Sequence, residues 1–157
     1  MIEVKQMTEC NQEIIKTIVN WMYHWWGKEE GYSLEELQSY ILHSFNSQGK
    51  LPQTYGLFID NKLIGMYQLT YQDLESRPDI YPWVANVYID KEYRHQGYSR
   101  YLLKTVYNYA KENQFHEIYL FTKHQGLYEK YGFEFIEEID TFTKKPRIQR
   151  LYRLKIK

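Results

Sequence analysis

One loop in the sequence combines residue types that suit the binding of a phosphate group. It lies between a strongly apolar segment and a long amphipathic one, and it reads Arg94-His95-Gln96-Gly97-Tyr98-Ser99. If a helix starts there, its first backbone N–H groups have no internal acceptor, and the helix dipole adds positive charge at that end. Gly97 leaves room for a close approach, and the Arg94 guanidinium suits a phosphate better than an ammonium does. The loop therefore predicts an anion site. The pattern is too short to identify the ligand.

The elements that must position this loop follow from the spacing of apolar residues. Alternation indicates strands, and recurrence every three or four residues indicates helices. Ser33 and Glu36 have the spacing of a capping box, and Gly27 and Gly132 are expected to end helices. The predicted order is strand 2–7, helices 11–26 and 33–45, strands 54–60, 63–71 and 83–89, helix 98–110, strand 115–121, short helix 124–130, and strands 133–138 and 148–156.

This order, β-α-α-β-β-β-α-β-α-β-β, indicates an α+β fold, a mixed α/β sandwich with helices on a mixed sheet. The 157 residues suffice for one domain, expected to span 1–157. The chain also contains 17 tyrosines and four tryptophans. Most of them are expected in strands and core, and a few near Trp25 and Trp26 are expected to line an aromatic groove.

Charge and composition exclude several classes of function. The 20 basic residues balance the 20 acidic ones, which argues against a nucleic-acid partner. The single cysteine, Cys10, cannot form an internal disulfide, and neither a signal sequence nor an apolar run of about 20 residues is present. We therefore expect a cytoplasmic protein without a membrane partner. No His/Cys cluster has metal-binding spacing, so no metal is expected.

Two motifs in sequence order resemble the GNAT acyltransferase superfamily. Residues 87–103 are similar to the family's motif A, whose loop is Arg/Gln-x-x-Gly-x-Gly/Ala between a strand and a long helix. The segment Leu127-Tyr128-Glu129-Lys130-Tyr131-Gly132-Phe133 is similar to motif B, in which an aromatic–Tyr pair precedes Gly-Phe. Ser99 departs from the family's Gly or Ala but is small, and the Asn often found after the fifth strand is not evident near Thr122. The resemblance implies the GNAT-like fold, with a central mixed, mostly antiparallel sheet.

The resemblance also implies an activity, the direct transfer of an acetyl group from acetyl-CoA to an amine without a covalent enzyme intermediate. In the family the fourth and fifth strands splay apart around the pantetheine arm, and an N–H near Ile89 would stabilise the oxyanion. Tyr128 matches the general acid that protonates the leaving thiolate. The implied coenzyme A contacts are Val87, Tyr88, Ile89, Arg94, His95, Gln96, Gly97, Tyr98, Ser99, Arg100 and Thr122.

The general base is less clear from the sequence. Asp73 is the first choice, because it lies just beyond the end of a predicted strand. Glu75, Asp79, His24 and His43 remain alternatives. An acceptor amine with a pKa of about 10 is mostly protonated at neutral pH, so some group must remove its proton.

The family resemblance places the acceptor beneath the first two helices. There Trp25 and Trp26 would bind a cationic amine together with Glu29 and Glu30, through cation–π and charge contacts. Packing of both tryptophans onto the sheet is the competing interpretation. Trp83 is expected to form the other wall. The acceptor is a small-molecule or peptide amine that the sequence does not identify, and a homodimer is an open possibility.

Two other functions compete with acetyl transfer. A non-catalytic acyl-CoA-binding or sensor module would use the same fold, since fold does not fix function. A nucleotide-binding domain is disfavoured, because both the Gly-x-x-x-x-Gly-Lys-Ser/Thr and Gly-x-Gly-x-x-Gly patterns are absent.

Overall fold

The sheet of this protein confirms the predicted mixed, mostly antiparallel α+β fold. The computed structural model describes residues 1–145 and 147–157, and within them seven strands form one sheet in the order β1-β2-β3-β4-β5-β7-β6. Only β4 and β5 pair in parallel among these strands. The chain runs through β1 (Ile2–Gln6), α1 (Gln12–Met22), η1 (Tyr23–Gly27), α2 (Leu34–Leu42), β2 (Gln53–Ile59), β3 (Lys62–Thr70), β4 (Trp83–Ile89), η2 (Lys91–Tyr93), α3 (Ser99–Glu112), β5 (Glu117–Thr122), η3 (Tyr128–Tyr131), β6 (Glu134–Asp140) and β7 (Ile148–Lys155).

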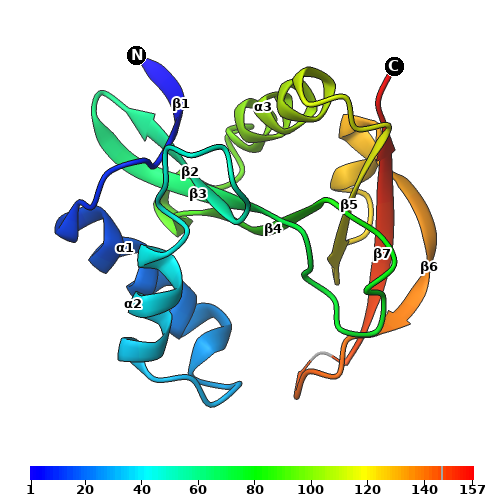
Figure 1. Cartoon of the computed structure of the whole chain (residues 1–157), viewed down its shortest axis with the longest axis horizontal. Coiled ribbons are helices and arrows are strands. Elements are labelled where there is room, and N and C mark those ends of the chain that lie inside the picture. Colours follow the sequence, from blue (N-terminus) through cyan, green and yellow to red (C-terminus); the bar gives the residue numbers. More distant parts are fainter. Residues whose placement is uncertain (146) are drawn as a thin grey trace.

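The helices cover both faces of the sheet. Figure 1 shows α3 on one side and α1 and α2 on the other. The predicted capping box begins α2, where Ser33 Oγ accepts from the Glu36 N–H at 3.0 Å and Glu36 Oε1 accepts from the Ser33 N–H at 2.9 Å. None of the described helices is both long and apolar enough to cross a membrane.

The first helix ends differently from the prediction. A regular helix was expected as far as Trp26, but after Met22 the chain forms a π-helical turn, η1, closed by the Lys28 N–H on the Tyr23 carbonyl at 2.9 Å. The wider turn lets Gly27 lie against α2, where a Cβ atom would come within 2.7 Å of Leu37 Cδ1. This tertiary contact has no counterpart in the local apolar spacing.

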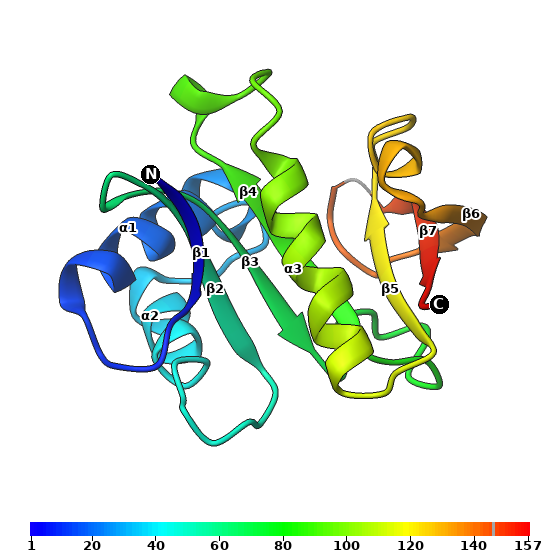
Figure 2. The same ribbon diagram turned by 90° about the horizontal axis from the view of Figure 1, so that it is seen from above.

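The two central strands diverge soon after they meet. β4 and β5 are paired at one position, Trp83 with Tyr119, where the Tyr119 N–H donates to the Pro82 carbonyl at 3.0 Å. Beyond it the strands separate, and α3 connects them along the chain (Figure 2). Parallel strands that part in this way leave the facing backbone groups of each strand without a sheet partner.

A β-bulge lies on β4 beside this gap. Gln68 pairs with Ala85 and Met66 pairs with Tyr88, so two residues of β4 lie opposite the single residue between them on β3. Asn86 takes up the extra length with a left-handed φ of +52°. An asparagine tolerates this conformation better than most residues do, and a bulged residue is left out of the ladder of hydrogen bonds.

Candidate active site

A cavity of about 750 Å³ occupies the space where the central strands separate. Its volume is in the range of small-molecule sites. One wall is formed by η1 and α2, another by the connection between β3 and β4, and a third by the turn between β6 and β7. The central strands and the η3 turn contribute Val84, Ala85, Asn86, Val87, Leu120, Phe121, Thr122 and Tyr128.

The predicted anion loop follows β4 and is open to solvent. His95 and Gly97 have positive φ angles of +63° and +79°, and a Cβ atom on Gly97 would meet nothing within 4 Å. Among the described residues, the N–H groups of Gln96, Gly97 and Tyr98 have no hydrogen-bond acceptor. Unpaired N–H groups at the start of a 14-residue helix form a favourable anion site.

Arg94 is held against β4. Its Nε atom donates to the Ile89 carbonyl at 2.7 Å, and its guanidinium lies 5.1 Å from the centre of the Tyr88 ring. The Asp90 N–H donates to Ile64 on β3, so strand alternation directs the N–H groups of Ile89 and Val87 to the opposite edge, towards the gap. The gap edge of β4 therefore offers the backbone groups that the resemblance required.

The other predicted contact residues of this segment have protein partners of their own. The Tyr88 ring faces η1 and contacts the Trp25 ring, with centres 5.2 Å apart. Gln96 Nε2 donates to the Glu92 carbonyl at 3.3 Å, and the Arg100 guanidinium stacks on its neighbour Tyr101. These side chains shape the loop, whereas the unpaired N–H groups are its free donors.

Positive charge gathers between this loop and the end of β5, a region that we call the donor end. His124 lines the cavity beside Lys123 and Thr122. Burial lowers the pKa of His124, and the positive charges of Lys123 and Arg94 lower it further. The Thr122 hydroxyl accepts from the His124 N–H at 3.1 Å, so it fixes the exit of β5.

Tyr128 lies in the wall of the cavity and is 6% exposed. Burial raises the pKa of its phenol, and Tyr131 raises it further, so the hydroxyl keeps its proton at neutral pH. Ser99 at the start of α3 and Tyr131 of the same turn share a hydrogen bond of 3.0 Å between their hydroxyls. This bond connects motif A with motif B, and its two residues lie 32 positions apart in the sequence.

Asp73 lines the cavity from the connection between β3 and β4, in the region that we call the acceptor end. Burial raises the pKa of its carboxyl to about 7. The hydroxyl of Tyr40 lies close by, and its own burial together with the Asp73 charge raises its pKa to about 12. Within the described part of the chain, no hydrogen bond or ion pair reaches the Asp73 carboxylate.

The alternative bases are placed less well. Asp79 is paired in a bidentate manner with Arg77, with both N–O distances 2.9 Å, and this pairing lowers its pKa. His24 and His43 are exposed and do not line the cavity, whereas Glu75 lines it and is exposed.

The three predicted tryptophans have different environments. Trp25 is 44% exposed and lines the cavity, as does the half-buried Trp26. The prediction that Trp83 forms a wall is wrong, because its side chain is 0% exposed and belongs to the core with Leu74 and Ile139. Its indole N–H donates within the fold, to the Ile80 carbonyl at 2.8 Å.

A polar network beneath Trp26 was not foreseen. Trp26 Nε1 donates to Asn86 Oδ1 at 3.1 Å, and Asn86 Nδ2 donates to Gln68 Oε1 at 2.7 Å. Gln68 in turn donates to the buried Thr54 hydroxyl at 3.0 Å, which shares a 2.6 Å bond with Ser44. The one sequence signal was an asparagine inside an otherwise apolar strand, and nothing local identifies its partners.

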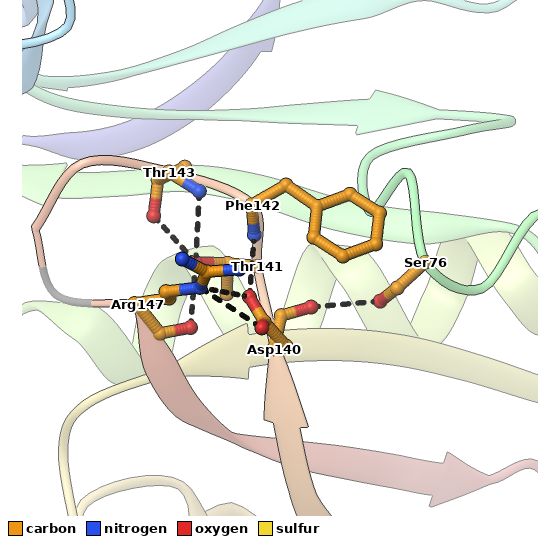
Figure 3. A network of polar contacts seen from close by, with 6 residues as sticks. All are labelled: Ser76, Asp140, Thr141, Phe142, Thr143 and Arg147. Atoms are coloured by element: carbon orange, nitrogen blue, oxygen red, sulfur yellow. Dashed lines mark hydrogen bonds and ion pairs between the residues drawn. The ribbon is translucent and has the colours of Figure 1, made fainter.

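The turn between β6 and β7 forms the third wall and was also missed. Figure 3 shows its network: the Asp140 carboxylate accepts from the Phe142 N–H at 2.9 Å and pairs with Arg147, and the Ser76 hydroxyl donates to the Asp140 carbonyl at 2.8 Å. Phe142 has a left-handed φ of +60°, is 58% exposed and lines the cavity. The network therefore holds a strained aromatic residue at the cavity rim.

A second contact ties this turn to the first wall. The Lys144 N–H donates to the Glu30 carboxylate, at 2.9 Å to Oε2 and 3.2 Å to Oε1. The two residues are 114 positions apart in the sequence. This bond connects the acceptor-end walls across the cavity mouth.

Comparison with known proteins provides an independent line of evidence. The profile of the Acetyltransferase (GNAT) family matches residues 16–133, three quarters of the chain. A search of curated proteins finds no match.

Solved structures of similar fold cover almost the whole chain. A GNAT family acetyltransferase from Elizabethkingia anophelis with acetyl-CoA bound is 20% identical, with a TM-score of 0.67 over 99% of this chain and 98% of that one. An N-acetyltransferase from Staphylococcus aureus Mu50 is 12% identical, with a TM-score of 0.69 over 99% and 97%. A probable acetyltransferase from Staphylococcus epidermidis is 13% identical, with a TM-score of 0.73 over the full length of both chains. At these identities the likeness establishes the fold.

Proposed function

The chain belongs to the Acetyltransferase (GNAT) family, and from that premise we propose that it transfers the acetyl group of acetyl-CoA directly to an amine of a small-molecule or peptide acceptor. One observation carries the proposal. One cavity is lined by the gap edge of β4, by the unpaired Asp73 carboxylate and by the protonated Tyr128 phenol, and the open loop with unpaired N–H groups follows the same strand. Transfer of an acetyl group from a phosphate-bearing donor to an amine requires groups of these kinds.

The donor end fits coenzyme A. The open loop around Gly97 would hold the pyrophosphate on the N–H groups of Gln96, Gly97 and Tyr98, with Arg94 and Lys123 supplying positive charge. The pantetheine arm would lie in the gap between β4 and β5 and bond to the free edge of β4. The acetyl-CoA bound to the Elizabethkingia anophelis protein of the same fold supports this assignment.

The acetyl group would lie near the bulge of β4. Attack of the amine on the thioester carbonyl places negative charge on its oxygen, and the N–H groups of Val87 and Ile89 face the gap where that charge develops. In other acyl transfers, removal of one such donor costs about 10² to 10³ in kcat. Collapse of the intermediate then breaks the C–S bond.

Tyr128 is proposed to protonate the departing thiolate. A free thiol has a pKa of about 8.5, so a phenol that keeps its proton at neutral pH is a suitable acid if it is aimed at the sulfur. The apolar contacts that raise the Tyr128 pKa also prevent the thiolate from meeting bulk water.

Asp73 is proposed as the general base. An ordinary carboxylate, with a pKa near 4, is too weak a base to take a proton efficiently from an ammonium. With a pKa of about 7, Asp73 combines a useful deprotonated fraction at neutral pH with greater basicity. It would remove the proton directly or through a water molecule.

Thiol release from acetyl-CoA, measured against a panel of amines, tests this function. In the variant Tyr128→Phe we expect kcat to fall about 10²-fold with the coenzyme A Kd unchanged, because only the acid is removed. Tyr81→Phe is the matched control, since Tyr81 is 56% exposed and does not line the cavity. Coenzyme A binding without turnover of any amine would indicate a sensor, and unaltered kcat in Tyr128→Phe would exclude the proposed acid.

A further inference from the structure

Carboxylates outnumber ammonium groups at the acceptor end. Asp73 and Glu75 line the cavity from the connection between β3 and β4, and three glutamates line it from the η1 and α2 side. Among the described residues, Lys145 is the one lysine that lines this end. The side chain of its neighbour Lys144 extends over Gly31. The glutamates of the η1 and α2 side are Glu29, Glu30 and Glu36.

Some of these carboxylates are already engaged, and some are not. Glu30 accepts from the Lys144 N–H, and Glu36 accepts from the Ser33 N–H in the capping box. Glu29, Asp73 and Glu75 have neither a hydrogen bond nor an ion pair to any residue that the structure describes.

The nearest guanidinium groups are unavailable for neutralising them. Arg77 is held by Asp79 and Glu137, and Arg147 is held by Asp140. The acceptor end therefore keeps unneutralised negative charge next to the half-buried Asp73. Negative charge of this kind attracts a cationic ligand.

The chemistry of transfer does not require so many carboxylates. The attacking nitrogen must lose its positive charge, and one base, Asp73, accounts for that proton. Glu29 and Glu75 are therefore suited to a positive charge that the reaction does not consume.

The lining of the acceptor end also suits an organic cation. Trp25, Tyr32 and Phe142 line the cavity and are 44%, 46% and 58% exposed, so their rings are open to a ligand. Aromatic faces attract alkylammonium groups. No group of three or more His, Cys, Asp or Glu side chains within residues 1–145 and 147–157 is arranged to hold a metal ion. The carboxylates come from two separate walls of the cavity, which suits an extended cation.

We propose that the acceptor is a linear diamine or polyamine, of which one amino group is acetylated at Asp73 while a second stays charged between Glu29 and the exposed aromatic rings. This inference rests on the proposed function. In the transfer step the N–C bond to the acetyl carbon forms and the C–S bond breaks. The ammonium gives its first proton to Asp73, which releases it to water before the attack. After the attack the nitrogen gives a second proton to Asp73, Tyr128 gives its proton to the sulfur, and water returns a proton to Tyr128.

Three acceptors of equal chain length test the proposal. They are n-butylamine, 1,4-diaminobutane and 4-aminobutyrate, which carry a methyl group, an ammonium or a carboxylate at the end that does not react. We expect kcat/KM to be at least 10-fold higher for the diamine than for n-butylamine, and lowest for the amino acid. Addition of 0.5 M KCl should reduce the advantage of the diamine, because salt screens charge pairs. Equal values for the diamine and the monoamine, or a preference for the amino acid, would overturn the proposal.

A charge-removing variant locates the second ammonium. Glu29→Gln should raise KM for 1,4-diaminobutane about 5-fold more than it raises KM for n-butylamine. Glu9→Gln is the matched control, because Glu9 is exposed and lies outside the cavity. Equal effects of Glu29→Gln on the KM of both amines would show that Glu29 does not bind the second ammonium group.

Binding measured by calorimetry, on protein saturated with coenzyme A, separates this inference from the proposed function. Binding of 1,4-diaminobutane in preference to n-butylamine, without thiol release from acetyl-CoA, supports the diamine site and contradicts the transferase. Thiol release with n-butylamine and no preference for the diamine contradicts the diamine site alone. Neither binding nor release contradicts both.

Discussion

The two ends of the cavity are built in different ways. The donor end comes mainly from one continuous stretch, the end of β4, the loop around Gly97 and the start of α3, and its ligand contacts are largely backbone N–H groups. The acceptor end is assembled from η1, α2, β4, the β3–β4 connection and the β6–β7 turn, and the groups that face the ligand are side chains. A site whose contacts are backbone groups is insensitive to most substitutions. A site whose contacts are side chains can change its ligand preference through a single substitution. The donor end is therefore suited to one cosubstrate, and the acceptor end to divergence.

The largest expected effect lies at the acceptor end, on chemistry. Asp73→Asn should lower kcat/KM about 10²-fold, because the amine loses its base. The wild-type kcat/KM should rise with pH through about 7 as Asp73 loses its proton, and the variant should lack this rise. Asp79→Asn is the control, since its carboxylate is already paired with Arg77. A wild-type pH profile retained in Asp73→Asn would assign the base elsewhere.

A substitution at the donor end should weaken cosubstrate binding alone. Gly97→Ala places a Cβ atom at a φ of +79°, in the space that the pyrophosphate would enter. We expect the coenzyme A Kd to rise about 10-fold, with acceptor KM unchanged at saturating acetyl-CoA. Gly49→Ala has the same kind of strain, at a φ of +72° with open space around it, in a loop away from the cavity. If both variants bind coenzyme A equally well, the loop is not the phosphate site.

The network beneath Trp26 allows a finer test of the difference between the ends. Trp26→Phe keeps an aromatic ring but removes the hydrogen bond to Asn86. The loss of that bond costs about 1 kcal/mol. That loss corresponds to about a 5-fold rise in acceptor KM, with the coenzyme A Kd unchanged. Trp83→Phe provides the contrast, because Trp83 is fully buried and should affect stability without favouring either ligand. Equal effects of Trp26→Phe on both ligands would reduce its role to packing.

The last expected effect concerns stability rather than activity. Asp73 has a pKa of about 7 in the folded protein and an ordinary value of 3.8, so the folded state binds its proton more tightly. Its contribution to stability is therefore present below about pH 4 and is lost as pH rises through about 7. Asp73→Asn stays neutral, and at pH 8 it should be more stable than the wild type by about 2 kcal/mol. Denaturant unfolding at pH 4 and pH 8 measures this, and no gain at pH 8 would mean that the carboxylate is well solvated.

The sequence predicted the strand and the helix of the donor end well, because local rules govern them. Strand 83–89 was predicted with its correct bounds, and the loop and the helix after it follow from apolar spacing and Gly97. The capping box of Ser33 and Glu36 is equally local and is also confirmed. Rules of this kind require only neighbours within a few residues.

The acceptor end was predicted only in part, because distant segments meet there. Trp25 and Trp26 were expected at the cavity and line it, yet the π-helical turn that presents them depends on Gly27 packing against α2. Trp83 was misplaced because burial on both faces of a central strand leaves no alternation from which to read its direction. The bonds of Asn86 to Gln68 and Trp26 and the Glu30–Lys144 bond join residues 18, 60 and 114 positions apart, beyond the range of any local pattern.

The turn between β6 and β7 has a consequence for how such a protein can diversify. Among its described residues, Asp140, Arg147 and the threonines between them bond to one another, and Ser76 and Glu30 bond to the turn from other segments. A segment with its own internal framework can be exchanged or lengthened while β6 and β7 keep their register. The turn can therefore be replaced as a unit at the rim of the cavity. Such a replacement, by engineering or by evolution, would change the acceptor preference without disturbing the residues that hold the acetyl donor.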